Sequence, residues 1–171
     1  MFKNIGSIGL GAMGGSYAKH LLENNFKVFG IDPDKENSKL FISNGGVILN
    51  NIKDLFVKSN VIILSLPTVP IFYKVIVEIE RCKYFTDPKV IIDMNTISLE
   101  DKIDAKHKLE KLNISLIDAP VSGTGAQAKI KDLVVMSSGS KKIVDKCKDI
   151  FNSFSRKNIF VGEFGNGVKF K

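Results

Sequence analysis

The sequence predicts an α/β protein with a doubly wound, mainly parallel sheet and helices on both of its faces. Apolar runs of strand length alternate with more polar segments from one end of the 171 residues to the other. A glycine-rich segment joins the first run to the first helical segment, and an acidic residue ends the second run. Because helices that connect parallel strands cover the faces of the sheet, these three observations together indicate that architecture.

The expected strands follow the apolar runs in chain order. They cover residues 5–10, 27–31, 61–66, 90–93, 114–117, 133–136 and 159–161, with a short strand at 47–49. Thr68-Val69-Pro70 is expected to open a helix, because proline is tolerated in a first turn. The segment from Ser98 to Asp101 resembles a capping box. Apolar residues at helical spacing predict one late helix over 143–154.

Composition excludes several classes of protein. The net charge of +7 comes from lysines interleaved with acidic residues, so we expect solvated helix faces rather than a nucleic-acid site, with attraction of a small anion as the functional alternative. No apolar stretch reaches the length of a membrane span, and the first strand begins too early for a signal peptide. Cys82 and Cys147 lack metal-ligand spacing, so we expect reduced thiols in a cytoplasmic protein and no metal site.

The glycine-rich segment is Gly9-Leu10-Gly11-Ala12-Met13-Gly14. The first glycine allows a tight turn, the second lets a pyrophosphate approach the backbone, and the third lets the helix pack on the strand. The start of the following helix offers unpaired N–H groups and a positive dipole end to phosphates. Flanked in this way, the segment predicts a Rossmann-type dinucleotide site, and residues 1–171 are expected to form a single dinucleotide-binding domain.

Asp32 ends the second strand, eighteen positions past the third glycine. A carboxylate there can accept hydrogen bonds from both hydroxyls of the adenosine ribose and would repel a 2′-phosphate. The next residues contain no arginine, so NAD is the expected cofactor, although Lys35 keeps NADP possible.

Three further strand ends carry short polar or small residues. They are Ser65-Leu66-Pro67, Asp93-Met94-Asn95-Thr96 and the longer segment at 117–126, which includes Ser122, Gly123 and Thr124. Since ligands bind at the carboxyl edge of such sheets, we expect these segments to meet there. Backbone amides and hydroxyls of the third segment could cradle an anion.

The glycine loop, the segment 93–96 and Asp118-Ala119-Pro120-Val121-Ser122-Gly123 together closely resemble the β-hydroxyacid dehydrogenase family, which includes 3-hydroxyisobutyrate dehydrogenase and, more distantly, 6-phosphogluconate dehydrogenase. The resemblance spans the whole chain. Two positions depart from it: Asn95 stands where serine is frequent, and Lys131 stands where a glycine is usual.

The resemblance also assigns a catalytic lysine. The family's Gly-x-x-Gly-x-Gly-x-x-x-Lys pattern fits residues 162–171 and places this role on Lys171, with Lys169 as the rival register. Family members continue into an all-helical domain that closes the active site and builds the homo-oligomer, so the chain is expected to be truncated before it. We therefore expect Lys171 to be mobile and solvated, with an untuned pKa, and the fragment alone to be inactive.

The implied chemistry is hydride transfer between a nicotinamide and a small anionic hydroxyacid or semialdehyde, with Lys171 as general acid or base. Ser122, Gly123 and Thr124 would hold the substrate carboxylate. Met13, Asp32, Leu66, Pro67 and Thr96 would line the dinucleotide. Two alternatives remain open: an imine reductase on the same fold, and an NAD-binding or NAD-sensing module without turnover.

Overall fold

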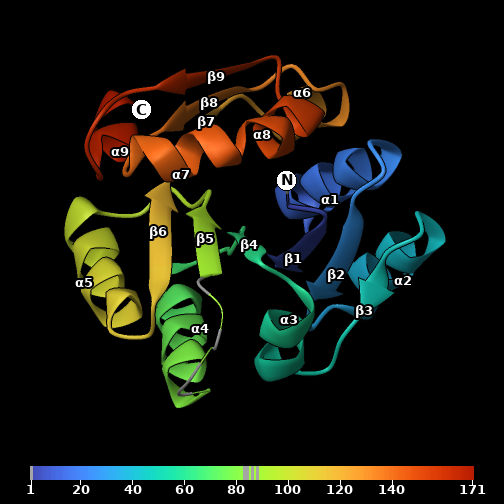
Figure 1. Ribbon diagram of the computed structural model, residues 1–171. Coiled ribbons are helices and arrows are strands. Elements are labelled where there is room, and N and C mark those ends of the chain that lie inside the picture. The colour runs from blue at the N-terminus through green and yellow to red at the C-terminus, as the bar shows by residue number, and fades with distance from the viewer. Residues whose placement is uncertain (1, 83–84, 86, 88) are drawn as a thin grey trace.

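The computed structural model describes residues 2–82, 85, 87 and 89–171. Its strands form two sheets (Figure 1). The larger sheet is six-stranded and parallel, in the order β3-β2-β1-β4-β5-β6. Its strands are β1 (Asn4–Ile8), β2 (Lys27–Ile31), β3 (Val47–Ile48), β4 (Val61–Leu64), β5 (Lys89–Asp93) and β6 (Ile114–Asp118). This strand order is that of a doubly wound sheet: strands are added toward one edge from β1 to β3 and toward the other edge from β4 to β6. It confirms the predicted fold class.

Helices cover both faces of this sheet, and each face has its own apolar core. The covering helices include α1 (Ala12–Glu23), α2 (Lys35–Ser43), α3 (Ile52–Lys58), α4 (Val69–Arg81) and α5 (Leu99–Glu110). Along β4, Val61 and Ile63 belong to the core that contains Tyr17 of α1, whereas Ile62 and Leu64 belong to the core under α3, α4 and α5. Since successive strand residues point to opposite faces, a strand buried on both sides reads as a continuous apolar run.

The expected helix starts are confirmed. Thr68 is the N-cap of α4, where its hydroxyl accepts from the Ile71 amide. Ser98 caps α5 in the same way, since its hydroxyl accepts from the Asp101 amide at 3.1 Å.

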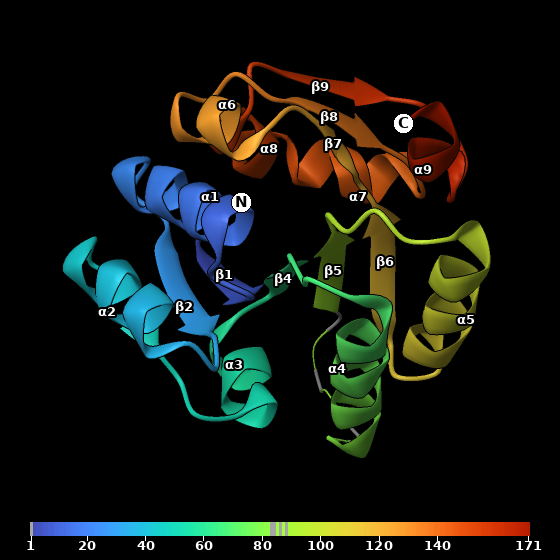
Figure 2. The same ribbon diagram turned by 180° about the vertical axis from the view of Figure 1, so that it is seen from behind.

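The last three strands form a separate sheet in the order β7-β8-β9, instead of extending the larger one. They are β7 (Val121–Ser122), β8 (Val134–Ser137) and β9 (Lys157–Phe160), and β7 is antiparallel to β8. The chain leaves the parallel sheet because Asp118 and Ser138 pair in an antiparallel bridge, two residues before Pro120, which cannot donate to a ladder. Figures 1 and 2 show this smaller sheet lying across the carboxyl ends of β5 and β6.

The predicted late helix is divided in two. Cys147 lies between α7 (Lys141–Lys146) and α8 (Lys148–Phe154), with φ −96° and ψ 3°. Its amide bonds to the Val144 carbonyl three residues back, so the first helix closes with a tight turn before the second begins. Two further short helices are α6 (Gly125–Lys129) and α9 (Asn166–Phe170).

Lys131 adopts the left-handed backbone conformation, with φ 61°, at the position where the family usually has glycine. A side chain in that region costs about 1–2 kcal/mol, which glycine avoids at some entropic loss in the unfolded chain. We therefore expect Lys131→Gly to raise the free energy of unfolding by about 0.5–1 kcal/mol, measured from urea denaturation. Asn113→Gly, at φ 60°, is the matched control and should gain less, because asparagine tolerates this region. A loss of stability in Lys131→Gly would contradict the expectation.

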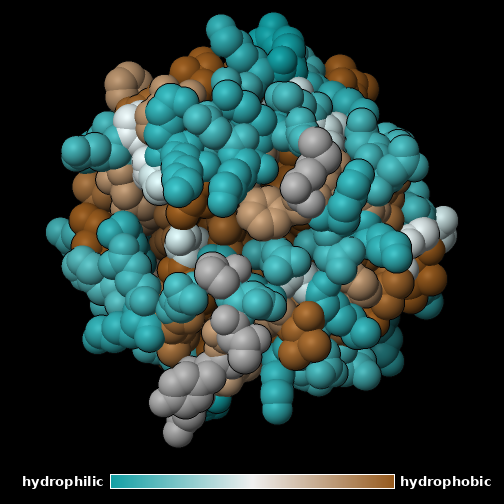
Figure 3. Space-filling view, viewed as in Figure 1, coloured by the Kyte–Doolittle hydropathy of each residue, from teal (hydrophilic) through white to brown (hydrophobic). Residues whose placement is uncertain are grey.

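Hydrophilic side chains cover most of the face seen in Figure 3, with separate apolar patches between them. Lys102 and Lys89 are exceptions to the expected solvated lysines, since both side chains are buried. None of the helices in the described part of the chain is long and apolar enough to cross a bilayer.

Candidate active site

A cleft of about 740 Å³ opens at the carboxyl ends of β1, β2 and β4, where the strand order reverses. Eight of the ten residues predicted to bind the cofactor line it: Gly9, Gly11, Ala12, Met13, Gly14, Asp32, Leu66 and Pro67. The cleft continues past residues that the sequence did not single out, among them Asn37, Asn50, Asn51 and Lys74. Reversal points of this kind are where doubly wound sheets bind nucleotides.

The three motif glycines are required for different reasons. A Cβ on Gly9, which has φ 91°, would overlap the Ser65 carbonyl, and one on Gly14 would overlap the Gly9 carbonyl. These two glycines therefore allow the turn and the close packing of α1 on β1. A Cβ on Gly11 would meet nothing within 4 Å, so this glycine leaves open space in the cleft.

The start of α1 faces this open space. Its N-cap, Gly11, provides no side-chain cap, so the first N–H groups of the twelve-residue helix are available to an anion. Shape and donors together fit a pyrophosphate at this point of the cleft.

Leu10 differs from the prediction, because it does not line the cleft. Its side chain is buried in the core beside α1, and its amide donates to Asp32 Oδ2 at 2.6 Å. Asp32 Oδ1 accepts from the Asp34 amide at 2.8 Å. The glycine loop and the chain after β2 thus fix the carboxylate of Asp32, which lines the cleft and has acceptor capacity beyond these two bonds.

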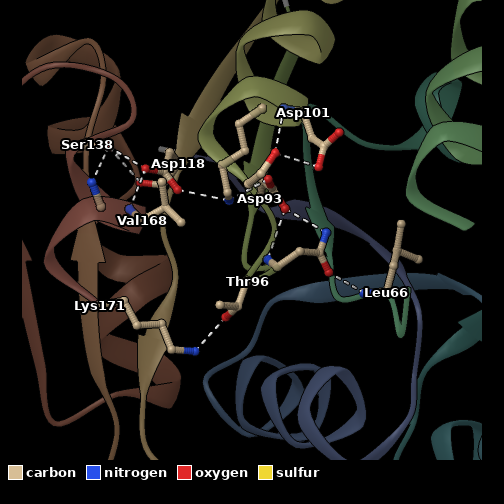
Figure 4. A network of polar contacts seen from close by, with 12 residues as sticks. Leu66, Asp93, Thr96, Asp101, Asp118, Ser138, Val168 and Lys171 are labelled. Atoms are coloured by element: carbon tan, nitrogen blue, oxygen red, sulfur yellow. Dashed lines mark hydrogen bonds and ion pairs between the residues drawn. The ribbon is translucent and has the colours of Figure 1, made fainter. Parts of the chain in front are cut away.

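Polar contacts tie the ends of β4 and β5 together. Asn95 Oδ1 accepts from the Leu66 amide at 2.6 Å, and Asn95 Nδ2 donates to Asp93 Oδ1 at 2.6 Å. The asparagine that departs from the family pattern is therefore a bridge between the cleft and a buried carboxylate. Figure 4 shows Leu66, Asp93 and Thr96 around this junction.

Behind the junction lies a fully buried ion triad. The Lys102 ammonium of α5 is 2.7 Å from Asp93 Oδ2 and 3.0 Å from Asp118 Oδ1, and all three side chains have no exposed surface. Burial raises the pKa of the Asp93 carboxyl, against the opposing effect of the Lys102 charge. Asp93 and Asp118 are register partners at the carboxyl ends of β5 and β6, so one cation serves two neighbouring strand ends.

The triad reaches α9 through Asp118. Asp118 Oδ2 accepts from the Ser138 hydroxyl and from the Val168 amide, each at 3.0 Å, and Ser138 Oγ accepts from the Gly167 amide at 3.0 Å. The N-cap of α9 is Gly165, at φ 91°, which has no side chain to cap the helix. Two residues far away in the sequence therefore satisfy the first amides of this short helix (Figure 4).

The helix presents Lys171 toward Thr96, the second residue predicted for the cofactor that lies outside the cleft lining. The Lys171 ammonium donates to Thr96 Oγ1 at 2.6 Å. Partial burial lowers the pKa of the Lys171 amine, and the like charge of Lys102 adds to this. The Lys171 side chain is exposed, as expected, but its amine bonds to Thr96 and its pKa is lowered rather than ordinary.

The predicted substrate segment begins at the same edge of the sheet, directly after β6. Ser122, Gly123 and Thr124 do not line the 740 Å³ cleft. A Cβ on the next residue, Gly125, would lie 3.7 Å from Ala12 Cβ, so the segment ends beside the start of α1. The Thr124 hydroxyl is engaged with Gln127 in the capping box of α6, whereas Ser122 is exposed.

The sequence did not reveal Lys102 and Ser138 as parts of this arrangement. One signal for Lys102 was present: it lies three and seven positions before Ala105 and Leu109, on the apolar face of α5. A lysine at a buried helix position requires carboxylates, and two strand-end aspartates supply them. Ser138 carried no such signal, because its role depends on the antiparallel bridge to Asp118. Among the described residues, no His, Cys, Asp and Glu side chains gather as a metal site.

Comparison with known proteins agrees with this geometry. A family model for the NAD binding domain of 6-phosphogluconate dehydrogenase matches residues 4–162. The 2-(hydroxymethyl)glutarate dehydrogenase of Eubacterium barkeri is 29% identical over 95% of this chain and 54% of the relative. An uncharacterized oxidoreductase of Bacillus subtilis, YkwC, is 32% identical over 98% of this chain and 58% of the relative. The chain thus spans just over half the length of these relatives.

Solved structures extend the comparison to the fold. Mycobacterium tuberculosis 3-hydroxyisobutyrate dehydrogenase with L-serine superposes with a TM-score of 0.92 at 24% identity, over 99% of this chain and 57% of that one. An imine reductase variant from Myxococcus stipitatus with NAD+ has a TM-score of 0.89 at 17% identity, over 99% and 58%. At these identities the likeness establishes the fold alone, whereas the family match covers nearly the whole sequence. Residues 4–162 carry the match, and on that basis the chain belongs to the family of the NAD-binding domain of 6-phosphogluconate dehydrogenase.

Proposed function

We propose that this chain is the nucleotide-binding part of an oxidoreductase that transfers hydride between NAD and a small β-hydroxyacid or semialdehyde. The contact between Lys171 and Thr96 carries the proposal, because it places a lysine with a lowered pKa at the end of β5, beside the nucleotide cleft. The names of relatives such as 2-(hydroxymethyl)glutarate dehydrogenase and glyoxylate/succinic semialdehyde reductase support this substrate class.

Each part of the cleft has a task in this proposal. The first amides of α1 hold the pyrophosphate, and Asp32 accepts hydrogen bonds from the adenosine ribose. Leu66 and Pro67 line the path toward the nicotinamide, and Thr96, outside the cleft lining, is proposed to extend it. When bound, the nicotinamide supplies hydride chemistry, and the protein supplies orientation and proton transfer.

Lys171 exchanges a proton with the oxygen of the substrate. On oxidation the neutral amine accepts the hydroxyl proton, and on reduction the ammonium returns it to the carbonyl oxygen. A lowered pKa favours the neutral form needed for oxidation near neutral pH. Lys169, the rival, lies two residues earlier on α9 and has no side-chain contact with Thr96 among the described residues.

The segment 122–124 is proposed to hold the substrate carboxylate. Because Thr124 already bonds to Gln127, Ser122 and the backbone at Gly123 are the freer donors. An all-helical domain, as the family resemblance implies, would complete the pocket and form the homo-oligomer, in a cytoplasmic enzyme. The fragment alone is proposed to bind nucleotide without turnover.

Asp32 gives the direct test of cofactor choice. Calorimetric titration of this chain should show tighter binding of NAD than of NADP. Asp32→Ala should weaken NAD binding roughly tenfold or more, since a hydrogen bond to a charged group contributes about 1.5–3 kcal/mol. The same variant should reduce the ratio of NAD affinity to NADP affinity. Glu36→Ala removes an equal charge outside the cleft and should change neither affinity. Equal or tighter NADP binding by the unaltered chain would refute the assignment.

A panel of hydroxyacids and semialdehydes, assayed with NAD in the native enzyme, separates the remaining functions. Turnover of a hydroxyacid supports the proposal, and reduction of cyclic imines instead would favour the imine reductase reading. Binding of NAD with no turnover of any class would identify a sensing module.

A further inference from the structure

The buried triad of Asp93, Lys102 and Asp118 lies between the cleft residues at the end of β4 and the start of α9, although none of its three side chains lines the cleft. On one side, Asp93 holds Asn95, which holds the Leu66 amide. On the other side, Asp118 holds the Val168 amide at the start of α9. Lys102 contacts both of these carboxylates and so joins them.

We propose that Lys102 is a positioning residue that fixes α9, and with it the Lys171 amine, relative to the cofactor-binding strand ends. The inference rests on the proposed function for the meaning of Lys171, but the positioning itself is a property of the fold. Four hydrogen bonds and two ion pairs make a continuous path from Leu66 to Val168. One hydrogen bond joins Leu66 to Asn95, and two join the amide and the side chain of Asn95 to Asp93. The two ion pairs join Lys102 to Asp93 and to Asp118, and the fourth hydrogen bond joins Asp118 to Val168.

Charge explains why a cation is required at this place. Asp93 and Asp118 are neighbours in register, and two buried carboxylates would repel each other without a cation between them. Asp118 also needs its charge, because a carboxylate makes a stronger acceptor than a neutral group for the α9 amides. With Lys102 in place, one ammonium contacts both carboxylates, whose remaining oxygens bond to Asn95 on one side of the triad and to Val168 on the other.

The geometry of α9 explains why positioning matters there. The helix has five residues, donates its Gly167 and Val168 amides to Ser138 and Asp118, and is followed by Lys171, which contacts Thr96. A helix this short is not stable by itself in water. Its placement therefore depends on the partners that receive its first amides.

The test is carried out on this chain with two variants and one control. Lys102→Met removes the cation, and Asp93→Asn with Lys102→Met and Asp118→Asn replaces the triad by neutral groups. The neutral set is needed because a broken buried pair strongly destabilises proteins, whereas neutral replacement of a whole triad is often tolerated. Lys108→Met is the control, since Lys108 lies on the same helix and pairs with Asp104 at the surface.

Amide hydrogen exchange at Gly167 and Val168 is the main measurement, referenced to the central β4 amides, which report global unfolding. In the neutral variant we expect exchange at these two amides to rise roughly tenfold to a hundredfold relative to β4, as the loss of a charge-assisted bond implies. The rate at which the Lys171 amine reacts with an acylating reagent should shift to that of an ordinary exposed lysine, because the Thr96 contact and the nearby Lys102 charge that distinguish it are lost. In Lys108→Met neither readout should move.

Two results would overturn the inference. One is a neutral variant that folds and keeps unaltered exchange at Gly167 and Val168, which would make the triad a purely structural part of the core. The other is Lys102→Met accelerating exchange uniformly in α9 and β4, with unchanged Lys171 reactivity in the folded fraction. NAD titration of the same variants keeps the proposed function separate, since the exchange result stands whether or not the chain binds NAD.

Discussion

Lys171→Ala is expected to lower the turnover of the native enzyme by about 10²–10⁴-fold, because this is the range that a positioned general acid or base contributes. NAD affinity should change little, since Lys171 lies outside the cleft lining. Steady-state kinetics measures the turnover, and calorimetry on the same preparation measures the NAD affinity. The rate of oxidation should also rise with pH through a group whose pKa lies below that of an ordinary lysine, because the neutral amine is the active form and the Lys171 pKa is lowered.

Lys169→Ala is the matched control on the same helix. It should retain most of the turnover, because its side chain is not the one that contacts Thr96. Loss of activity in Lys169→Ala with survival in Lys171→Ala would move the proton-transfer role to the rival position. Robust turnover by residues 1–171 alone would show that the expected helical domain is dispensable.

Gly11→Ala and Gly14→Ala are both expected to weaken NAD binding, but only Gly14→Ala is expected to destabilise the fold. At Gly11 the added methyl group meets no protein atom within 4 Å, so the free energy of unfolding should stay within about 0.5 kcal/mol. The methyl group would, however, occupy cleft space meant for a pyrophosphate, so NAD affinity should fall by roughly tenfold or more.

At Gly14 the added methyl group overlaps the Gly9 carbonyl, which belongs to the backbone and cannot rotate away. The first turn of α1 must move off β1, so we expect a loss of stability of about 1–3 kcal/mol, as for overpacked cores, together with weaker NAD binding. Thermal unfolding and calorimetry on both variants test the pair. If Gly11→Ala bound NAD as tightly as the unaltered chain, the pyrophosphate would have to lie elsewhere.

The sequence predicted most successfully where function depends on neighbouring residues. The glycine loop and Asp32 come from one βαβ unit, so spacing alone indicated their meeting at the cleft. Strand and helix starts such as Thr68 and Ser98 were predictable for the same reason, since a cap acts within its own turn.

Prediction failed where a contact joins distant segments. Lys102 was expected on a solvated face like the other lysines, because its carboxylate partners lie 9 and 16 residues away on two different strands. The second sheet depends on the bridge between Asp118 and Ser138, and no local sequence pattern predicts this bridge. Lys171 was expected to be mobile because no helix follows it; the bond that holds α9, from the Val168 amide to Asp118, spans 50 residues and has no local signal.

The capping of α9 by residues from other segments has a consequence for folding order. Contacts that span 50 residues form after local helices and hairpins, because the chain must first lose the entropy of a large loop. The proposed proton-transfer group therefore reaches its place only when β6 and β8 have already met. A partly folded chain could display its nucleotide loop, but it would lack an ordered amine, so reactivity would develop as the final stage of maturation.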